Sequence, residues 1–241
     1  MVIMLLFYFL TSHLITTSVS NDYISADLMS RIIDVSDKNE KIAYLTFDDG
    51  PTTSVTPKVL DILKDENIKA TFFVIGKSVE SHPDIVKRAY EEGHYIANHG
   101  YDHNNSNLYK SAENFISEIK KTDLAIGKAI GVENYCSHLF RFPNGFMAPK
   151  YKSQKRKAVS LLSDINYSYI DWNCLNNDSV KKCSPSQLLA NLKKSSKGKN
   201  ILVILMHDTK DVSNSSLALE DSISYLKSQG YEFKNFYSLL P

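Results

Sequence analysis

The chain has 241 residues, of which 43% are hydrophobic and 23% are charged, and its formal net charge is +1. This composition is typical of a globular protein with enough apolar residues for one large core. Lys and Arg are scattered without a dense basic block, so the charge indicates neither nucleic acid nor an anionic membrane as a partner.

The first twenty residues have the pattern of a secretory signal peptide. Val2 to Leu10 form an apolar run that is too short for a comfortable transmembrane helix, and Ser18-Val19-Ser20 resembles a cleavage site. Because no Lys or Arg precedes the apolar run and the first is Arg31, an uncleaved anchor is the alternative. We therefore expect residues 1–20 to be a signal peptide or anchor, residues 21–40 to be a polar linker, and the protein to be secreted or attached to the cell surface.

From Lys41 onward, strand-like and helix-like segments alternate. Apolar and β-branched runs predict strands at 42–47, 70–75, 95–97, 139–142, 167–172, 201–206 and, weakly, 231–233. Helical periodicity predicts helices at 57–66, 83–92, 112–130, 153–163, 184–196 and 215–229. This alternation predicts a parallel sheet, either doubly wound or closed as a barrel, whose strand-end loops emerge on one face.

Two adjacent carboxylates, Asp48 and Asp49, follow the first predicted strand and precede the turn at Gly50-Pro51. Like charges this close resist joint ionisation unless something compensates for them. A bound cation would compensate, whereas capping of the following helix is the alternative interpretation. These two residues are therefore candidates for a metal site.

Imidazole and guanidinium groups lie at the ends of later strands. His99 and His103 follow the third strand, Arg141 lies in the fourth, and His207 ends the sixth. Gly100 stands where a metalloprotease HExxH motif has its glutamate, so that motif is absent. Arg141 lies within an apolar strand, where a charge needs a partner. Each residue alone has a structural interpretation, but together they indicate a site at one face of the sheet.

The three cysteines, Cys136, Cys174 and Cys183, match no zinc-binding or CxxC spacing and are too few for a disulfide scaffold. We expect free thiols, and a Cys174–Cys183 bridge in an oxidising compartment is the alternative.

In these motifs the sequence resembles the polysaccharide deacetylases, also called the NodB-homology or carbohydrate esterase family 4 domain. The resemblance covers residues 41–241 and implies a single catalytic domain folded as a distorted (β/α) barrel of seven or eight strands. Asp178-Ser179 keeps only the aspartate of the family's fourth motif. The segments that carry the resemblance are Thr46–Pro51, His99–His103, Arg141–Gly145, Asp178 and Leu205–Asp208.

The resemblance implies a divalent metal bound by Asp49, His99 and His103. Zn²⁺ is the expected ion, with Co²⁺ or another divalent ion as the alternative. It also implies that Asp48 is the general base and that Arg141 tethers this base.

Further roles follow from the same resemblance. His207 would be the general acid, and Asp178 would orient it. Asn144 would offer a backbone N–H to the substrate oxyanion, and Leu205 and Trp172 would line the pocket for the acetyl methyl group.

The implied reaction is hydrolysis of N-acetyl groups from N-acetylglucosamine in a cell-wall polysaccharide, with peptidoglycan as the expected substrate and the chain acting as a monomer. Chitin oligomers and O-acetylated xylan are alternative substrates. A non-catalytic polysaccharide binder on the same fold and a different metallohydrolase are alternative functions. Four aromatic residues of the strand-end loops would either stack on sugar rings or pack within the protein: Tyr101, Tyr109, Phe146 and Tyr151.

Overall fold

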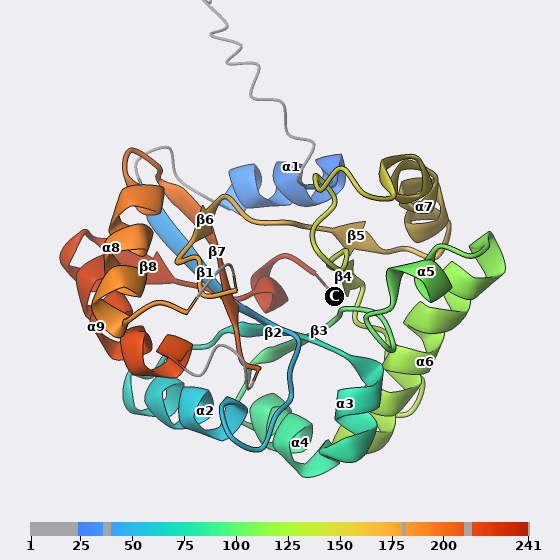
Figure 1. The fold of residues 1–241 in the computed structure, drawn as a ribbon, viewed down its shortest axis with the longest axis horizontal. Helices are drawn as coiled ribbons and strands as arrows, with labels where there is room; N and C mark the ends of the chain where they lie inside the picture. The colour runs from blue at the N-terminus through green and yellow to red at the C-terminus, as the bar shows by residue number, and fades with distance from the viewer. Residues whose placement is uncertain (1–23, 36–39, 180–181, 210–213, 241) are drawn as a thin grey trace, which may run out of the picture.

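The computed structural model describes residues 24–35, 40–179, 182–209 and 214–240 (Figure 1). The predicted signal peptide or anchor at 1–20 lies outside these residues. Within them, no helix combines the length and the apolar character that crossing a membrane requires.

Eight strands form one sheet in which every strand pair is parallel. Their order is β5-β4-β3-β2-β1-β7-β6, and β8 pairs with the beginning of β1. Because β5 and β6 stand at opposite ends of this order, the barrel is open, and the prediction of a distorted (β/α) barrel is confirmed. The strands are β1 (Lys41–Asp48), β2 (Thr71–Val74), β3 (Tyr95–Asn98), β4 (Leu139–Phe140), β5 (Ser168–Tyr169), β6 (Cys174–Leu175), β7 (Ile201–His207) and β8 (Tyr231–Phe233).

Most of the helices surround the strands on the outside of the barrel (Figure 1). Local signals define several helix ends: Ser111 caps the longest described helix, which ends at Gly131 in the left-handed region, and Ser184 forms a capping box with Gln187. The described helices are α1 (Ala26–Val35), α2 (Thr56–Asp65), α3 (Gly76–Ser81), α4 (Pro83–Glu91), α5 (Asn105–Leu108), α6 (Ala112–Ile130), α7 (Lys152–Asp164), α8 (Pro185–Ser196), α9 (Asn214–Ser228) and the 3₁₀ helix η2 (Phe236–Ser238).

Strand β1 lies in the middle of the sheet and is buried on both faces. Ala43, Leu45 and Phe47 belong to the core between the sheet and the outer helices. Side chains alternate along a strand, so the opposite face carries Tyr44, which stacks on Phe236 of η2 at 4.9 Å between ring centroids. Thr46 and Asp48 share this inner face with Tyr44, and the last strand residue, Asp48, pairs in register with His207 of β7. The parallel register therefore brings polar strand ends together.

Residues 24–35 contradict the expectation of a linker over 21–40. Ile24 forms an antiparallel bridge with Ile170, and α1 buries Leu28 and Ile32 in the cluster around Tyr44. The four-residue spacing of Leu28 and Ile32 places both on one helix face, which packs while the polar residues between them stay accessible. The linker prediction is wrong here because the polar residues of this stretch obscured a short amphipathic helix.

The three cysteines carry free thiols, as expected. Cys174 and Cys183 are both buried, and Cys136 is partly exposed. Cys174 begins β6, a strand that the sequence did not predict because only two residues of it pair with β7.

Candidate active site

Asp49, His99 and His103 come together at the ends of β1 and β3. The Oδ1 atom of Asp49 lies 3.3 Å from Nε2 of each histidine, and all three ligand atoms lie within 4.8 Å of one another. Left-handed backbone at Asp49 (φ 74°) and His103 (φ 56°) accompanies this convergence. The loop that carries the two histidines is shaped by Asn98, whose side-chain oxygen accepts from the Gly100 N–H.

The Asp49 Oδ1 atom is buried and has no hydrogen-bond donor among the described residues. A buried acceptor of this kind is costly unless a partner satisfies it. Burial favours a raised pKa for Asp49, but the nearby His99 and His103 outweigh it and lower the pKa well below its usual value. One carboxylate and two imidazoles form a donor set that suits a divalent metal with open coordination positions.

The tautomer of His99 follows from its partner on the other side of the ring. Its Nδ1 lies 2.8 Å from the Arg141 carbonyl oxygen, which can only accept, so Nδ1 carries the proton. The Nε2 lone pair is then directed toward Asp49. Backbone support of this type fixes the ring orientation of metal-binding histidines.

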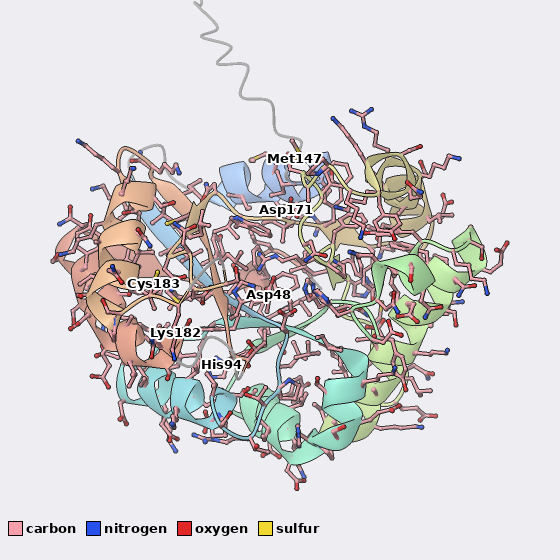
Figure 2. The ribbon with its side chains drawn as sticks, viewed as in Figure 1. Asp48, His94, Met147, Asp171, Lys182 and Cys183 are labelled. Carbon is pink, nitrogen blue, oxygen red and sulfur yellow. The ribbon has the colours of Figure 1, made fainter. Side chains whose placement is uncertain are left out.

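Arg141 is completely buried and forms an ion pair with Asp48 (Figure 2 labels Asp48). One guanidinium nitrogen donates to Asp48 Oδ1 and to Thr46 Oγ1, both at 2.7 Å. The other two nitrogens donate to the carbonyl oxygens of Ile170 at 3.0 Å and Asp171 at 2.9 Å. The guanidinium is therefore held from several sides, and it fixes the direction of the Asp48 carboxylate.

His207 forms a second carboxylate–imidazole pair, with Asp178. Its Nδ1 lies 2.7 Å from Asp178 Oδ1, and its backbone N–H donates to Asp178 Oδ2 at 2.8 Å. The Ser215 hydroxyl donates to the same Oδ2. Burial lowers the pKa of His207, but the hydrogen bond and charge of Asp178, with smaller contributions from Asp48 and Asp49, raise it to about 9. The imidazole is thus held in its protonated form near neutral pH.

The three residues predicted to bind substrate lie around these pairs. Leu205 is two residues before His207 on β7 and so faces the same side of the sheet. Asn144 is exposed, and its side-chain oxygen accepts from Asn105 at 2.7 Å. The Trp172 ring lies against Gly145. It is so close that a Cβ at this glycine would lie 2.8 Å from the ring. The structure thus places Trp172 beside the Asn144 loop and Leu205 beside His207.

Asp208 was part of a motif in the sequence but had no assigned role. It is 1% exposed, and its carboxylate accepts from the Thr56 hydroxyl at 2.6 Å. Burial raises its pKa to about 7. A Cβ at Gly50 would lie 2.2 Å from Asp208 Oδ2, so a glycine is required at this turn for lack of space. Asp208 therefore packs the turn after Asp49 rather than joining the metal cluster.

Of the four loop aromatics, two pack within the protein. Tyr109 lies parallel to Phe115, with ring centroids 6.3 Å apart, and Phe146 lies 4.9 Å from Tyr169. Tyr151 lies 5.2 Å from Tyr109, and Tyr101 is partly exposed.

The structure is an open parallel α/β barrel with an Asp–His–His cluster at its strand ends. Two ion pairs, Asp48 with Arg141 and Asp178 with His207, lie at the same strand ends. This combination defines a class of barrel proteins with a candidate metal-assisted active site. Within this class, the sequence profile described as polysaccharide deacetylase matches residues 35–168. The chain belongs to the polysaccharide deacetylase family.

Named relatives and a solved structure agree with this assignment. The chain is 36% identical over 223 residues to the peptidoglycan-N-acetylglucosamine deacetylase PgdA of Listeria monocytogenes, covering 91% of this chain and 43% of that protein. It is 36% identical over 205 residues to a peptidoglycan-N-acetylglucosamine deacetylase of Bacillus cereus, covering 83% and 71% of the two chains. The catalytic domain of a peptidoglycan N-acetylglucosamine deacetylase from Eubacterium rectale superposes with a TM-score of 0.76 at 28% identity, covering 86% of this chain and 93% of that chain. The chain thus spans less than half of the Listeria relative.

Proposed function

We propose that this protein hydrolyses N-acetyl groups of N-acetylglucosamine residues in a cell-wall polysaccharide, with peptidoglycan as the substrate, and releases acetate. The observation that carries the proposal is the buried, unsatisfied Asp49 oxygen facing His99 and His103, next to an Asp48 carboxylate held by Arg141. The names of the relatives support the substrate class. Because one chain carries all these groups, we propose that it acts as a monomer, outside the cell membrane where peptidoglycan lies.

Asp49, His99 and His103 would hold a divalent metal, for which Zn²⁺ is our proposal. When bound, such an ion polarises a carbonyl oxygen and lowers the pKa of water. The donor set fits because the two imidazoles are neutral ligands and the Asp49 oxygen lacks any other partner.

Asp48 would take a proton from the attacking water. The Arg141 ion pair at 2.7 Å holds this carboxylate and directs Oδ2 toward the cluster, where it lies 3.9 Å from His99 Nε2. A carboxylate that is held in a fixed direction beside the cluster suits a general base.

His207 would protonate the leaving amine. Its raised pKa keeps a proton on the ring at neutral pH, and Asp178 holds the ring through Nδ1, which leaves Nε2 as the donor to the substrate. The Asn144 N–H would donate to the oxyanion, and Leu205 and Trp172 would border the acetyl group.

The test is acetate release by the protein from residue 21 onward, stripped with chelator and reconstituted with Zn²⁺ or Co²⁺. We expect metal-dependent release from peptidoglycan and from N-acetylglucosamine oligomers. An Asp48→Asn variant should lose about 10²–10⁴-fold in kcat because the base is removed. Its zinc affinity, measured by calorimetry, should stay close to wild type.

Asp164→Asn, at an exposed position at the end of α7, is the matched control and should keep full activity. Zinc binding without release from either N-acetylated substrate would contradict the N-deacetylase proposal. Release from acetylated xylan in that case would identify an O-deacetylase, and no release from any polymer together with polysaccharide binding would identify a binder.

A further inference from the structure

Asp171 is a buried carboxylate that the proposed mechanism does not use. It follows β5, is 3% exposed, and stands directly before Trp172. Figure 2 shows it between Met147 and Asp48 in this view. A buried carboxylate needs hydrogen-bond donors, so its partners indicate what it does.

Asp171 binds the backbone of the loop that follows Arg141. Its Oδ1 accepts from the Phe146 N–H at 2.8 Å, and its Oδ2 accepts from the Met147 N–H at 3.1 Å. Its backbone carbonyl accepts from Arg141 at 2.9 Å. The same residue therefore links the guanidinium that holds Asp48 to the loop that carries Asn144.

Lys155 holds the same loop through its carbonyl groups. This side chain lies on α7 and is 1% exposed, and its ammonium group donates to the carbonyl oxygens of Gly145 at 2.5 Å and Ala148 at 3.3 Å. Burial lowers the pKa of Lys155, and the charge of Asp171 opposes this shift. Two buried side chains of opposite charge thus bind one short loop, the carboxylate through N–H groups and the ammonium through C=O groups.

The loop conformation leaves one N–H group available. The N–H of Gly145 donates to Phe142 O at 2.7 Å, that of Ala148 donates to Gly145 O at 3.4 Å, and those of Phe146 and Met147 donate to Asp171. For the Asn144 N–H, the described residues provide no acceptor. Within residues 144–148, this is therefore the N–H that could serve a ligand.

The geometry around Asn144 tolerates little change. Asn144 and Gly145 have φ values of 64° and 82°, in the left-handed region. A Cβ at Gly145 would lie 2.8 Å from Trp172 and 3.3 Å from Asp171 Oδ2. Glycine is thus required at position 145 both by its backbone conformation and by the close approach of these two side chains.

We infer that Asp171 and Lys155 are positioning residues that fix the Asn144 N–H as the hydrogen-bond donor to the negative charge that develops on the substrate carbonyl oxygen. The inference rests on the proposed function. A donor that is already in place stabilises this charge without reorganising during the reaction, and a displacement of about 1 Å costs about 10²-fold in rate. Loosening the loop should therefore lower kcat more than it weakens substrate binding.

The test uses Asp171→Asn and Lys155→Met in the zinc-loaded protein. Asparagine keeps the size of the side chain but directs an NH₂ group at a backbone donor, and methionine keeps the stem of Lys155 but removes its hydrogen bonds. Asp164→Asn and Lys157→Met, both exposed residues of α7, make the same changes outside the loop. The measurements are kcat and KM on N-acetylglucosamine oligomers, zinc affinity, thermal stability, and amide hydrogen exchange of residues 144–148.

We expect kcat to fall about 10- to 100-fold in both loop variants, with KM and zinc affinity near wild type and faster exchange in the loop. Unchanged loop exchange in folded variants, or unchanged kcat, would overturn the inference. A lower kcat that comes together with a lower melting temperature and a raised KM would also overturn it, because these changes indicate a structural role. If the wild type releases no acetate, the proposed function fails, and the exchange data still decide whether Asp171 and Lys155 hold the loop.

Discussion

At the scale of single residues, the proton on His207 depends on Asp178. The hydrogen bond at 2.7 Å and the negative charge of Asp178 outweigh the burial of the ring and give a pKa of about 9. A bound divalent cation would act in the opposite direction, because like charges disfavour the protonated imidazole. The pKa of His207 therefore depends both on Asp178 and on whether a metal ion is bound.

This balance predicts a pH profile. A general acid works while it is protonated, so activity should hold below the pKa of His207 and fall as the pH rises through it. Asp178→Asn removes the charge that raises the pKa, so the alkaline limb of kcat should move to lower pH, toward the ordinary value near 6.5. The measurement is kcat against pH at saturating zinc, supported by NMR titration of the metal-free imidazole.

Asp65→Asn, on the exposed end of α2, is the control and should leave the profile in place. If the alkaline limb of Asp178→Asn coincided with that of the wild type, His207 would not be the titrating acid.

The side chains that come together at strand ends were predictable from the sequence. Asp49 and His99 were predictable because each stands directly after a strand of a parallel sheet, where side chains from distant segments meet. Asp171 and Lys155 were not, because their partners are backbone groups of a loop whose path depends on left-handed residues at 144 and 145. Asp208 was missed as a packing residue because its contacts, with Gly50 and with the Thr56 hydroxyl, form only when the turn is folded.

At the scale of elements, α1 ties the N-terminal part of the described chain to the barrel. Leu28 is fully buried and Ile32 nearly so, in the same cluster as Tyr44 of β1 and Phe236 of η2. The Ser25 N–H donates to the Tyr169 carbonyl oxygen at 3.0 Å, which adds a backbone bond to β5. The helix thus covers one side of the apolar cluster that contains Tyr44 and Phe236.

Removing the packing of α1 should lower the stability of the whole domain. We expect Leu28→Ala to reduce the free energy of unfolding by about 2–5 kcal/mol, as for other buried leucines. Denaturant titration followed by tryptophan fluorescence measures this, and the exposed Ser30→Ala on the same helix should change little. A value for Leu28→Ala near that of Ser30→Ala would mean that the helix contributes no packing energy.

The elements that were missed have two physical reasons. β6 has two residues, α5 has four and α3 has six, so none of them has the length that a periodic pattern needs. α1 has the pattern, with Leu28 and Ile32 four residues apart, but its Asp and Ser residues made the stretch resemble a linker. The long elements β1, β7 and α6 were predicted because their apolar residues recur over several turns or along a whole strand.

At the scale of the whole molecule, the candidate metal ligands connect two strands of an open sheet. Asp49 follows β1, and His99 and His103 follow β3, with β2 between them. A ligand that binds only the folded state stabilises it, by about 2.7 kcal/mol at a concentration 100 times the Kd. Metal binding should therefore be visible in global unfolding.

We expect saturating zinc to raise the melting temperature of the metal-free protein by about 5–10 °C, since 1 kcal/mol corresponds to roughly 2–4 °C at this size. Asp49→Asn should remove most of the increase, because the amide replaces a charged ligand. Differential scanning calorimetry with and without zinc measures both. An equal increase in the variant would locate the stabilising ion at some other place on the protein.

The docking of α1 also limits how far the active site could travel if an N-terminal anchor is retained. A free linker over residues 21–40 would extend to roughly 65–70 Å at about 3.3–3.6 Å per residue. Because Ile24 is paired with Ile170 and α1 packs against the barrel, residues 24–35 cannot extend in this way. We therefore propose that an anchored form would hold the active site closer to the membrane than a fully extended linker over residues 21–40 would allow.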